Sequence, residues 1–167
     1  MVSLIRTTPM GVGRRLPDMD ATRSQGAYRP RLAIIAHDGK KADLVAFATF
    51  NRRRLQRCDL MATGTTGTLL VEKVGLRVER VESGPIGGDV QIASRIVDGQ
   101  VDAVVFVVDP LDKHPHDPDI QTLLRICNVR NVPLATNIAT ADILISSGLF
   151  WRVDADGARD GEGEQAG

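Results

Sequence analysis

Short apolar runs alternate with longer amphipathic segments through the middle of this 167-residue chain. The short runs predict buried strands, and the longer segments, in which apolar residues recur every three or four positions, predict helices. Strict alternation of this kind is typical of a doubly wound sheet with right-handed crossovers. We therefore expect an α/β fold of the three-layer Rossmann type, a mostly parallel five-stranded sheet with helices on both faces. The predicted strands cover residues 32–36, 59–62, 77–81, 101–108 and 132–135, and the predicted helices lie near 40–56, 66–74, 89–98, 120–129 and from 139 onward.

The two ends of the chain lack this pattern. Residues 1–30 hold scattered prolines, glycines and arginines, which predicts a flexible N-terminal arm. Residues 153–167 are rich in acids and glycine and predict a disordered tail. Between them, residues 31–152 are expected to form one domain, long enough to bury a core without disulfides or metals.

Composition narrows the class of protein. Apolar residues make up 43% of the chain and charged residues 25%, the usual balance for a globular domain. The formal net charge is zero, so we expect neither a nucleic-acid nor a membrane partner. Cys58 and Cys127 each lie in an apolar-periodic segment and predict buried thiols rather than a disulfide. No apolar run has transmembrane length and the N-terminus lacks the apolar centre of a signal peptide, which predicts a cytoplasmic protein.

Each of the five predicted strands is followed by polar or ionisable residues at its carboxyl end. In a parallel sheet these ends open onto one edge, where ligands bind. Helix caps and glycines are common in such loops and could account for any single exit. They account poorly for all five together, so we expect a functional site at this edge. The exits are residues 37–38, 63–66, 83–89, 109–119 and 136–137.

Two of the exits suit an anion. Residues 63–66 and 83–84 combine threonine and serine hydroxyls with glycine backbone N–H groups at predicted helix starts. Such groups bind phosphates well, although a threonine in this position can equally be a helix cap. No lysine follows the glycine as it does in a nucleotide P-loop. Lys40 or Lys41 could supply a cation, or either could be an ordinary surface lysine.

Three ionisable residues could move protons at the same edge. Asp89 follows two glycines at a predicted helix start, where a carboxylate can act as a general base or simply interact with the helix dipole. His116 and Asp119 belong to the neighbouring exit. Two carboxylates and an imidazole would allow one group to remove a proton while another polarises a carbonyl.

Two other kinds of site fit parts of this pattern. The histidine-containing exit could bind zinc, but Pro115 restricts the two histidines and no cysteine joins them, so a metal-free site is favoured. A receiver-type phosphoacceptor site would need an aspartate after the third strand and a lysine after the fifth. Residues 82–83 and 136 do not supply them, which excludes that site. The candidate zinc ligands are His114, His116, Asp117 and Asp119.

Six short motifs in a fixed order closely resemble those of the methylglyoxal synthase family. The match runs through about residues 31–146, with near-identical spacing. Any one motif alone would be a weak signal, whereas the six together are highly specific. The motifs are A-H-D at residues 36–38, A-T-G-T-T-G at 62–67, S-G-P-I-G-G-D at 83–89, D-P-L at 109–111, P-H-D-P-D at 115–119 and A-T-N-I-A-T-A-D at 135–142.

The resemblance implies a carbon–oxygen lyase that converts dihydroxyacetone phosphate into methylglyoxal and inorganic phosphate, without metal or organic cofactor. It implies that Asp89 removes a proton from the hydroxymethyl carbon, that His116 stabilises the resulting ene-diolate, and that Asp119 is a second catalytic carboxylate. It gives His37 a substrate-binding role and Asp38 and Asp109 supporting roles. The phosphate-binding residues that it implies are Lys41, Thr63, Gly64, Thr65, Thr66, Ser83 and Gly84.

The resemblance also implies a homohexamer and free phosphate as a regulator as well as a product. Arg125 matches a family arginine tied to the phosphate response, but it could also be an ordinary solvated helix residue. Past residue 150 the chain departs from the family, because the acidic, glycine-rich tail replaces a more ordered segment. That departure leaves phosphate regulation open.

A non-catalytic binding module of the same fold is the main alternative, and a zinc hydrolase is a more distant one. A binding module would need the threonine and serine cradle for its phosphorylated ligand. It would not need Asp89, His116 and Asp119 together. The presence of all three favours the lyase, with dihydroxyacetone phosphate as its substrate.

Overall fold

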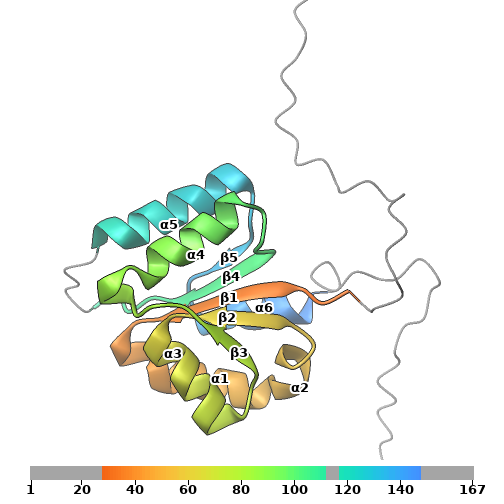
Figure 1. Ribbon diagram of the computed structural model, residues 1–167. Coiled ribbons are helices and arrows are strands. Elements are labelled where there is room, and N and C mark those ends of the chain that lie inside the picture. Colours follow the sequence, from red (N-terminus) through yellow and green to blue (C-terminus); the bar gives the residue numbers. More distant parts are fainter. Residues whose placement is uncertain (1–27, 112–116, 148–167) are drawn as a thin grey trace, which may run out of the picture.

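The structure, a computed structural model, describes residues 28–111 and 117–147, with the side chains of residues 85 and 117–120 excluded. The predicted tail and most of the predicted N-terminal arm therefore lie outside the described residues. The predicted α/β fold is confirmed (Figure 1): the strands form one parallel sheet in the order β3-β2-β1-β4-β5. The strands are β1 (Arg31–Ala36), β2 (Asp59–Ala62), β3 (Val78–Arg80), β4 (Ala103–Val107) and β5 (Leu134–Ala135).

Helices cover both faces of this sheet. In Figure 1, α4 (Gly88–Val97) and α5 (Asp117–Arg130) lie on one face, while α1 (Lys41–Phe50) and α3 (Gly64–Leu69) lie on the other. The second face also carries α6 (Ile138–Ser146), which packs against α1. The remaining short elements are α2 (Arg52–Leu55), the π-helical η2 (Leu70–Val74), and the 3₁₀ turns η1 (Asp38–Lys40) and η3 (Gly84–Ile86).

Alternation along the two central strands divides the core between these faces. In β1, Leu32 and Ile34 pack with α1 and α6, whereas Ala33 and Ile35 pack with α4 and α5. Residues of β4 divide in the same way, and every one of them is buried. Because both faces are covered, β1 from residue 32 onward and the whole of β4 are apolar at every position, which is why each appears in the sequence as a continuous apolar run.

The prediction of one continuous first helix is wrong. The sequence predicts a helix over residues 40–56, but the structure breaks it at Asn51 into α1 and α2. The Asn51 side chain is buried and donates to the Phe47 carbonyl at 3.2 Å and to Asp142 Oδ1 in α6 at 3.1 Å. An asparagine that bonds to local backbone competes with the helix ladder, so the break serves the contact between α1 and α6.

Other predicted boundaries shift by a few residues. The predicted helix at residues 66–74 begins earlier, at residue 64, and its second half is the π-helix η2, which ends at Gly75 with φ of 71°. Strands β3, β4 and β5 are all shorter than the predicted 77–81, 101–108 and 132–135. Among the described residues, no helix is long and apolar enough to cross a membrane.

Arg31 and Asp102 tie β1 to β4 at the amino edge of the sheet. The Arg31 side chain donates to Asp102 Oδ1 at 2.9 Å and its backbone N–H donates to Asp102 Oδ2 at 2.9 Å. Burial alone would raise the pKa of Asp102, but the hydrogen bonds from Arg31 outweigh it and hold that pKa below its ordinary value. The two cysteines are free and buried, as predicted, and burial raises the pKa of Cys58 to about 12 and that of Cys127 to about 11.

Candidate functional site

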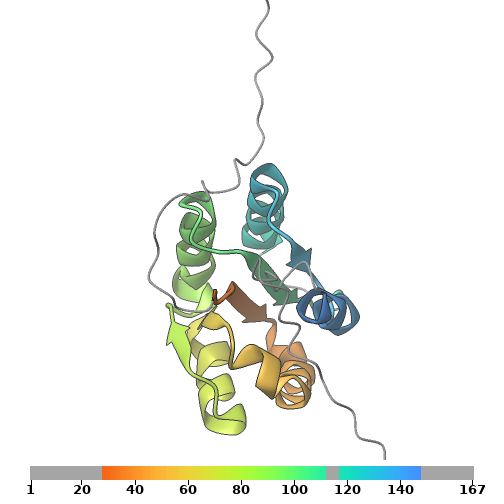
Figure 2. The same cartoon turned by 90° about the vertical axis from the view of Figure 1, so that its right-hand side faces the viewer.

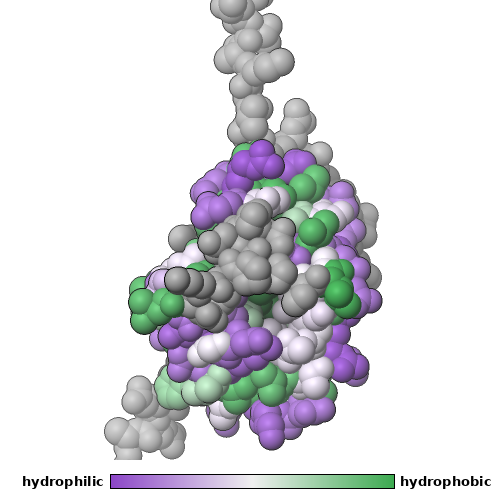
Figure 3. All heavy atoms as spheres, turned by 90° about the vertical axis from the view of Figure 1, so that its left-hand side faces the viewer, coloured by the Kyte–Doolittle hydropathy of each residue, from purple (hydrophilic) through white to green (hydrophobic). Residues whose placement is uncertain are grey.

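The sheet order brings the polar strand exits together at one edge. Strand β1 lies between β2 and β4, so its exit at His37 is flanked by the exits of both neighbours. The His37 backbone N–H extends the ladder by donating to the Val107 carbonyl at 3.1 Å. Figure 3 looks onto this edge, where polar and neutral surface predominates, with apolar residues mainly toward the rim.

The ring of His37 is held in one orientation and one tautomer. The Asp109 backbone N–H donates to His37 Nδ1 at 2.9 Å, so this nitrogen carries no proton. The proton of the neutral ring therefore resides on Nε2, which makes that atom a hydrogen-bond donor. Phe106 meets the ring edge to face, with 5.1 Å between centroids and 87° between planes. These contacts turn His37 into an oriented donor at the centre of the edge.

Asp109 also closes the loop after β4 against the turn after β1. Its Oδ1 accepts from the Leu111 backbone N–H at 3.2 Å. Its Oδ2 lies so near Gly39 that an added Cβ there would come within 2.5 Å of it. A side chain at residue 39 would therefore displace the Asp109 carboxylate from this position. The supporting role of Asp109 stays a prediction.

Lys41 connects the exits of β1 and β2. Its ammonium group bonds to Asp38 Oδ1 and, at 2.8 Å, to Thr65 Oγ1. The Lys41 side chain is only 19% exposed, whereas the Asp38 side chain is 91% exposed. A positive charge held this way beside threonine hydroxyls is suited to a phosphate, and an exposed carboxylate can give way to one. Of the two lysines considered from the sequence, the structure brings Lys41 to Thr65, while Lys40 pairs with Asp43 at 3.5 Å.

The three threonines of the β2 exit have different environments. Thr63 and Thr66 are buried and their hydroxyls bond to each other at 3.2 Å. Thr65 is exposed and faces Lys41. The backbone N–H groups of Thr65 and Thr66 lie in the first turn of α3, where a helix supplies no acceptor of its own. The Thr65 hydroxyl and these amides are therefore better placed for an anion than the Thr63 and Thr66 hydroxyls are.

The peptide of Glu82 joins the β2 exit to α4. Its carbonyl accepts from the Gly64 N–H at 3.1 Å, and its N–H donates to Gln91 Oε1 at 2.9 Å. Gly88 packs so closely on this carbonyl that an added Cβ would lie 1.8 Å from the oxygen. The loop from residue 82 to 88 therefore has a backbone path that only glycine at position 88 allows. Gln91 belongs to no recognisable motif, so no signal in the sequence singled it out.

Asp89 occupies the first turn of α4, directly after this loop. Its Oδ1 is buried and has no hydrogen-bond partner among the described residues. A buried carboxylate oxygen without a partner is costly and is uncommon away from functional sites. Asp89 is therefore the described residue whose environment most needs a functional explanation.

The structure describes some of the other predicted site residues and leaves out others. Ser83 joins the loop through its carbonyl, which accepts from the Ile86 and Gly88 N–H groups. An added Cβ on Gly84 would meet nothing within 4 Å, so this residue borders open space. Asn137 caps α6 by accepting from the Thr140 N–H at 2.9 Å, which gives it a structural role. Asp119 lies in the first turn of α5 with its side chain outside the described residues, and His116 lies outside them altogether.

A hollow of about 540 Å³ lies between the exits of β2 and β3, where Thr65, Glu82 and Ser83 are among its lining residues. Within the described ranges no three histidine, cysteine, aspartate or glutamate side chains gather as a metal site would require. The proposed zinc ligands His114 and His116 lie outside those ranges, so that alternative stays untested. The described part of the edge offers groups suited to an anion, an imidazole donor and a carboxylate with one buried oxygen.

Comparison with known proteins finds relatives that share one name. A family model described as "MGS-like domain" matches residues 43–136. The chain is 57% identical over 127 residues to the methylglyoxal synthase of Cupriavidus pinatubonensis, and this alignment covers 76% of this chain and 96% of the relative. It is 54% identical over 119 residues to the methylglyoxal synthase of Hahella chejuensis, covering 71% and 78%. The crystal structure of methylglyoxal synthase from Elizabethkingia anophelis superposes with a TM-score of 0.71 at 43% identity, covering 77% of this chain and 89% of that one.

Proposed function

The chain belongs to the methylglyoxal synthase family, and we propose that it is a carbon–oxygen lyase that converts dihydroxyacetone phosphate into methylglyoxal and inorganic phosphate. The observation that supports its chemistry most strongly is the buried Oδ1 of Asp89, which has no partner among the described residues. A carboxylate oxygen that no described donor occupies is available to accept a proton from carbon.

The phosphate of the substrate binds at the exits of β2 and β3. Lys41 supplies the positive charge, the Thr65 hydroxyl already bonds to it, and the first-turn amides of α3 supply further donors. Gly84 borders open space, so its backbone can approach the phosphate closely. Ser83 contributes its hydroxyl. Binding here costs little reorganisation because these groups are held before the substrate arrives.

Proton removal begins the reaction. The Asp89 carboxylate takes a proton from the hydroxymethyl carbon, and the C–H electron pair moves toward the carbonyl to form an ene-diolate. Negative charge then grows on two oxygens of the substrate, first on the former carbonyl oxygen and then on the hydroxyl oxygen, whose proton passes to the departing phosphate as this oxygen becomes the aldehyde carbonyl. His37, with its proton on Nε2, can donate to one of them, and the family resemblance assigns the same role to His116. Asp119 is the second carboxylate, able to return a proton to oxygen.

Phosphate loss completes the reaction. Electrons of the ene-diolate form a new carbon–carbon double bond as the bridging carbon–oxygen bond breaks, and the phosphate leaves with that bond's electron pair. The remaining enol takes a proton on its terminal carbon and becomes methylglyoxal. Elimination requires the breaking bond to stand out of the ene-diolate plane, so that its electrons overlap the π system. The cradle therefore contributes to the rate as well as to affinity.

The first experiment follows methylglyoxal and phosphate together when chelator-treated protein is given dihydroxyacetone phosphate. Equal, protein-dependent release of both is expected. Asp89→Asn should lower kcat by roughly 10²–10⁴ with the fold retained. Asp98→Asn, at the other end of the same helix, is the matched control and should keep full activity. Release of neither product by folded protein that still binds a phosphorylated ligand would instead identify a binding module.

Three finer features belong to this proposal, and the first and third of them rest on the family resemblance alone. They are a homohexamer, a cytoplasmic location and a regulatory response to free phosphate that involves Arg125. Light scattering on the purified chain measures the first. Saturation curves for substrate at several phosphate concentrations test the last, because regulation makes them sigmoidal and simple competition does not.

A further inference from the structure

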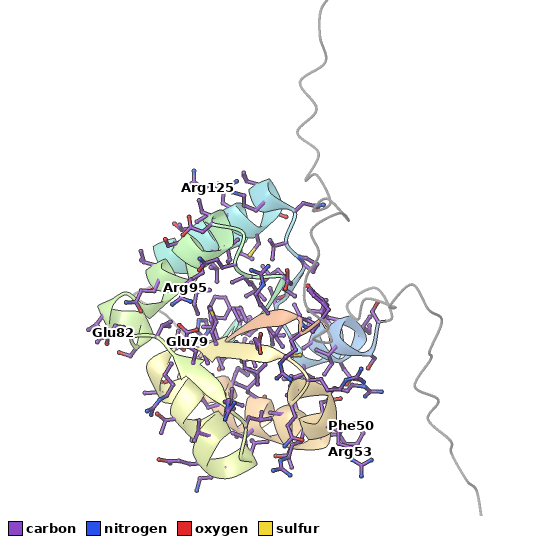
Figure 4. All side chains as sticks on the ribbon, turned by 45° about the vertical axis from the view of Figure 1, so that its right-hand side comes forward. Phe50, Arg53, Glu79, Glu82, Arg95 and Arg125 are labelled. Carbon is purple, nitrogen blue, oxygen red and sulfur yellow. The ribbon has the colours of Figure 1, made fainter. Side chains whose placement is uncertain are left out.

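On the side of the molecule opposite the candidate site, α2 presents a cluster of arginines beside an exposed aromatic ring. Arg52, Arg53 and Arg57 are exposed, and Arg54 is half-buried. Phe50, the last residue of α1, is 84% exposed, and Figure 4 shows it and Arg53 projecting from the same corner. Within the described residues, Arg52 and Arg53 take part in no ion pair. These five residues are called the α2 surface below.

The described chain ends beside this surface. The 3.1 Å hydrogen bond from Asn51 to Asp142 fixes α6 against the junction of α1 and α2. Ile143, the residue after Asp142, is 72% exposed. Ser147 follows five residues beyond Asp142, roughly 7.5 Å of helix rise. Figure 2 looks onto this side of the molecule and shows α6 next to α1.

The sequence that follows Ser147 has the complementary chemistry. Residues 149–153 read Leu-Phe-Trp-Arg-Val and are mostly apolar, and residues 154–164 hold five acids and one arginine. The acidic segment thus has a net charge of −4, and because the chain as a whole is neutral, residues 1–153 have a net charge of +4. The apolar segment thus matches the exposed Phe50 ring, and the acidic segment matches the arginines.

We propose that residues 149–164 bind the α2 surface of the same chain. Phe150 and Trp151 cover Phe50 and Ile143, and the acids lie beside the arginines. The segment is long enough to reach the α2 surface, because the seven residue steps from Ser147 to Asp154 span up to roughly 23 Å when extended.

Two physical effects favour this contact over an uncovered surface. Adjacent arginines repel one another, and an acidic segment removes that repulsion. Exposed ion pairs are individually weak and are screened by salt. Here several act together with the burial of aromatic surface, and attachment to the same chain gives the acidic segment a high effective concentration at the α2 surface.

Trp151 is the only tryptophan of the chain and therefore reports on this contact directly. The experiment measures its emission maximum and its quenching by acrylamide in the full-length protein. The test variants are Arg52→Gln with Arg53→Gln, and separately Phe50→Ser. The control removes two positive charges elsewhere, through Lys73→Gln with Arg130→Gln, both at exposed positions. Circular dichroism checks that every variant is folded.

In the wild type and the control, the emission maximum of Trp151 is expected to be blue-shifted and its fluorescence to be shielded from acrylamide. The arginine and Phe50 variants should lower the ratio of docked to undocked tail by roughly fivefold or more. About 1 M salt, where the Debye length is about 3 Å, should expose Trp151 in the wild type. The proposal is overturned if wild-type Trp151 is quenched like a free indole, or if the variants shield it equally. Shielding that disappears on dilution overturns it as well, because a second copy then covers the tryptophan.

Discussion

Replacing Gly88 by alanine tests whether the loop from residue 82 to 88 positions the site. The added Cβ would lie 1.8 Å from the Glu82 carbonyl oxygen, so the two must separate by more than roughly 1 Å in a close-packed region. That displacement breaks the 3.1 Å hydrogen bond from Gly64 to the same oxygen. Overpacking costs about 1–3 kcal/mol and the lost hydrogen bond about 1 kcal/mol. For a chain of this size the result is a fall in Tm of roughly 5–15 °C.

Activity should fall as well, because Gly64 belongs to the phosphate cradle and Asp89 follows Gly88 directly. A misplacement of about 1 Å at such a site can lower kcat/KM by about 10²-fold. Thermal unfolding and steady-state kinetics, the latter at a temperature where the variant is folded, measure the two effects separately. Gly84→Ala is the control within the same loop, since its Cβ meets nothing within 4 Å. It should keep its Tm and raise the KM for substrate. Wild-type Tm and kcat/KM in Gly88→Ala would refute the reasoning, because the loop would then tolerate displacement.

Three further predictions concern the cradle, the amino edge and the thiols. Thr65→Val removes the hydroxyl that accepts from Lys41 and should raise both KM and the inhibition constant of free phosphate by roughly 10-fold. Unchanged saturation by both ligands would contradict that assignment. Asp102→Asn should destabilise the protein at pH 7 by about 1–2 kcal/mol, discounted for the partial exposure of Arg31. Because the folded pKa of Asp102 is lowered, the wild-type advantage is complete above the unfolded pKa of about 4 and disappears as pH falls below it; denaturant unfolding at pH 7 and pH 3 measures this. Cys58 and Cys127, with pKa values raised to about 12 and about 11, should resist a thiol reagent at pH 8 in the native state and react after denaturation.

The sequence predicted the sheet well because both faces of its central strands are covered. Positions 32–36 of β1 and all positions of β4 are apolar whichever way they point, so the runs are visible without knowledge of the partners. Boundaries were less predictable where a side chain from another element decides them. Asn51 is an unremarkable helix residue until Asp142 of α6 is brought next to it. The short β5 likewise depends on pairing with β4 and not on its own two residues.

The same distinction between local and long-range signals applies to the candidate site. The motifs singled out the proposed cradle and Asp89, because glycines, threonines and acids at strand exits are local signals. They could not reveal that Thr63 and Thr66 bond to each other, or that Gln91 supports the Glu82 peptide. Both facts depend on the path of the folded backbone. The roles proposed for His116 and Asp119 stay predictions, since their side chains lie outside the described residues.

The central place of β1 has a consequence for the order in which the molecule is assembled. Strand β1 meets β2 through Leu32 and Leu60, but it meets β4 through Leu32 and Ala103, about 70 residues apart. Closing that longer loop costs more chain entropy, and ribosomal synthesis delivers β4 last of the two. The half built from β1, β2 and β3 already carries Lys41, Thr65 and Ser83. These proposed cradle residues therefore leave the ribosome before Asp109, which orients His37, so the complete site forms only after the second half of the sheet has been added.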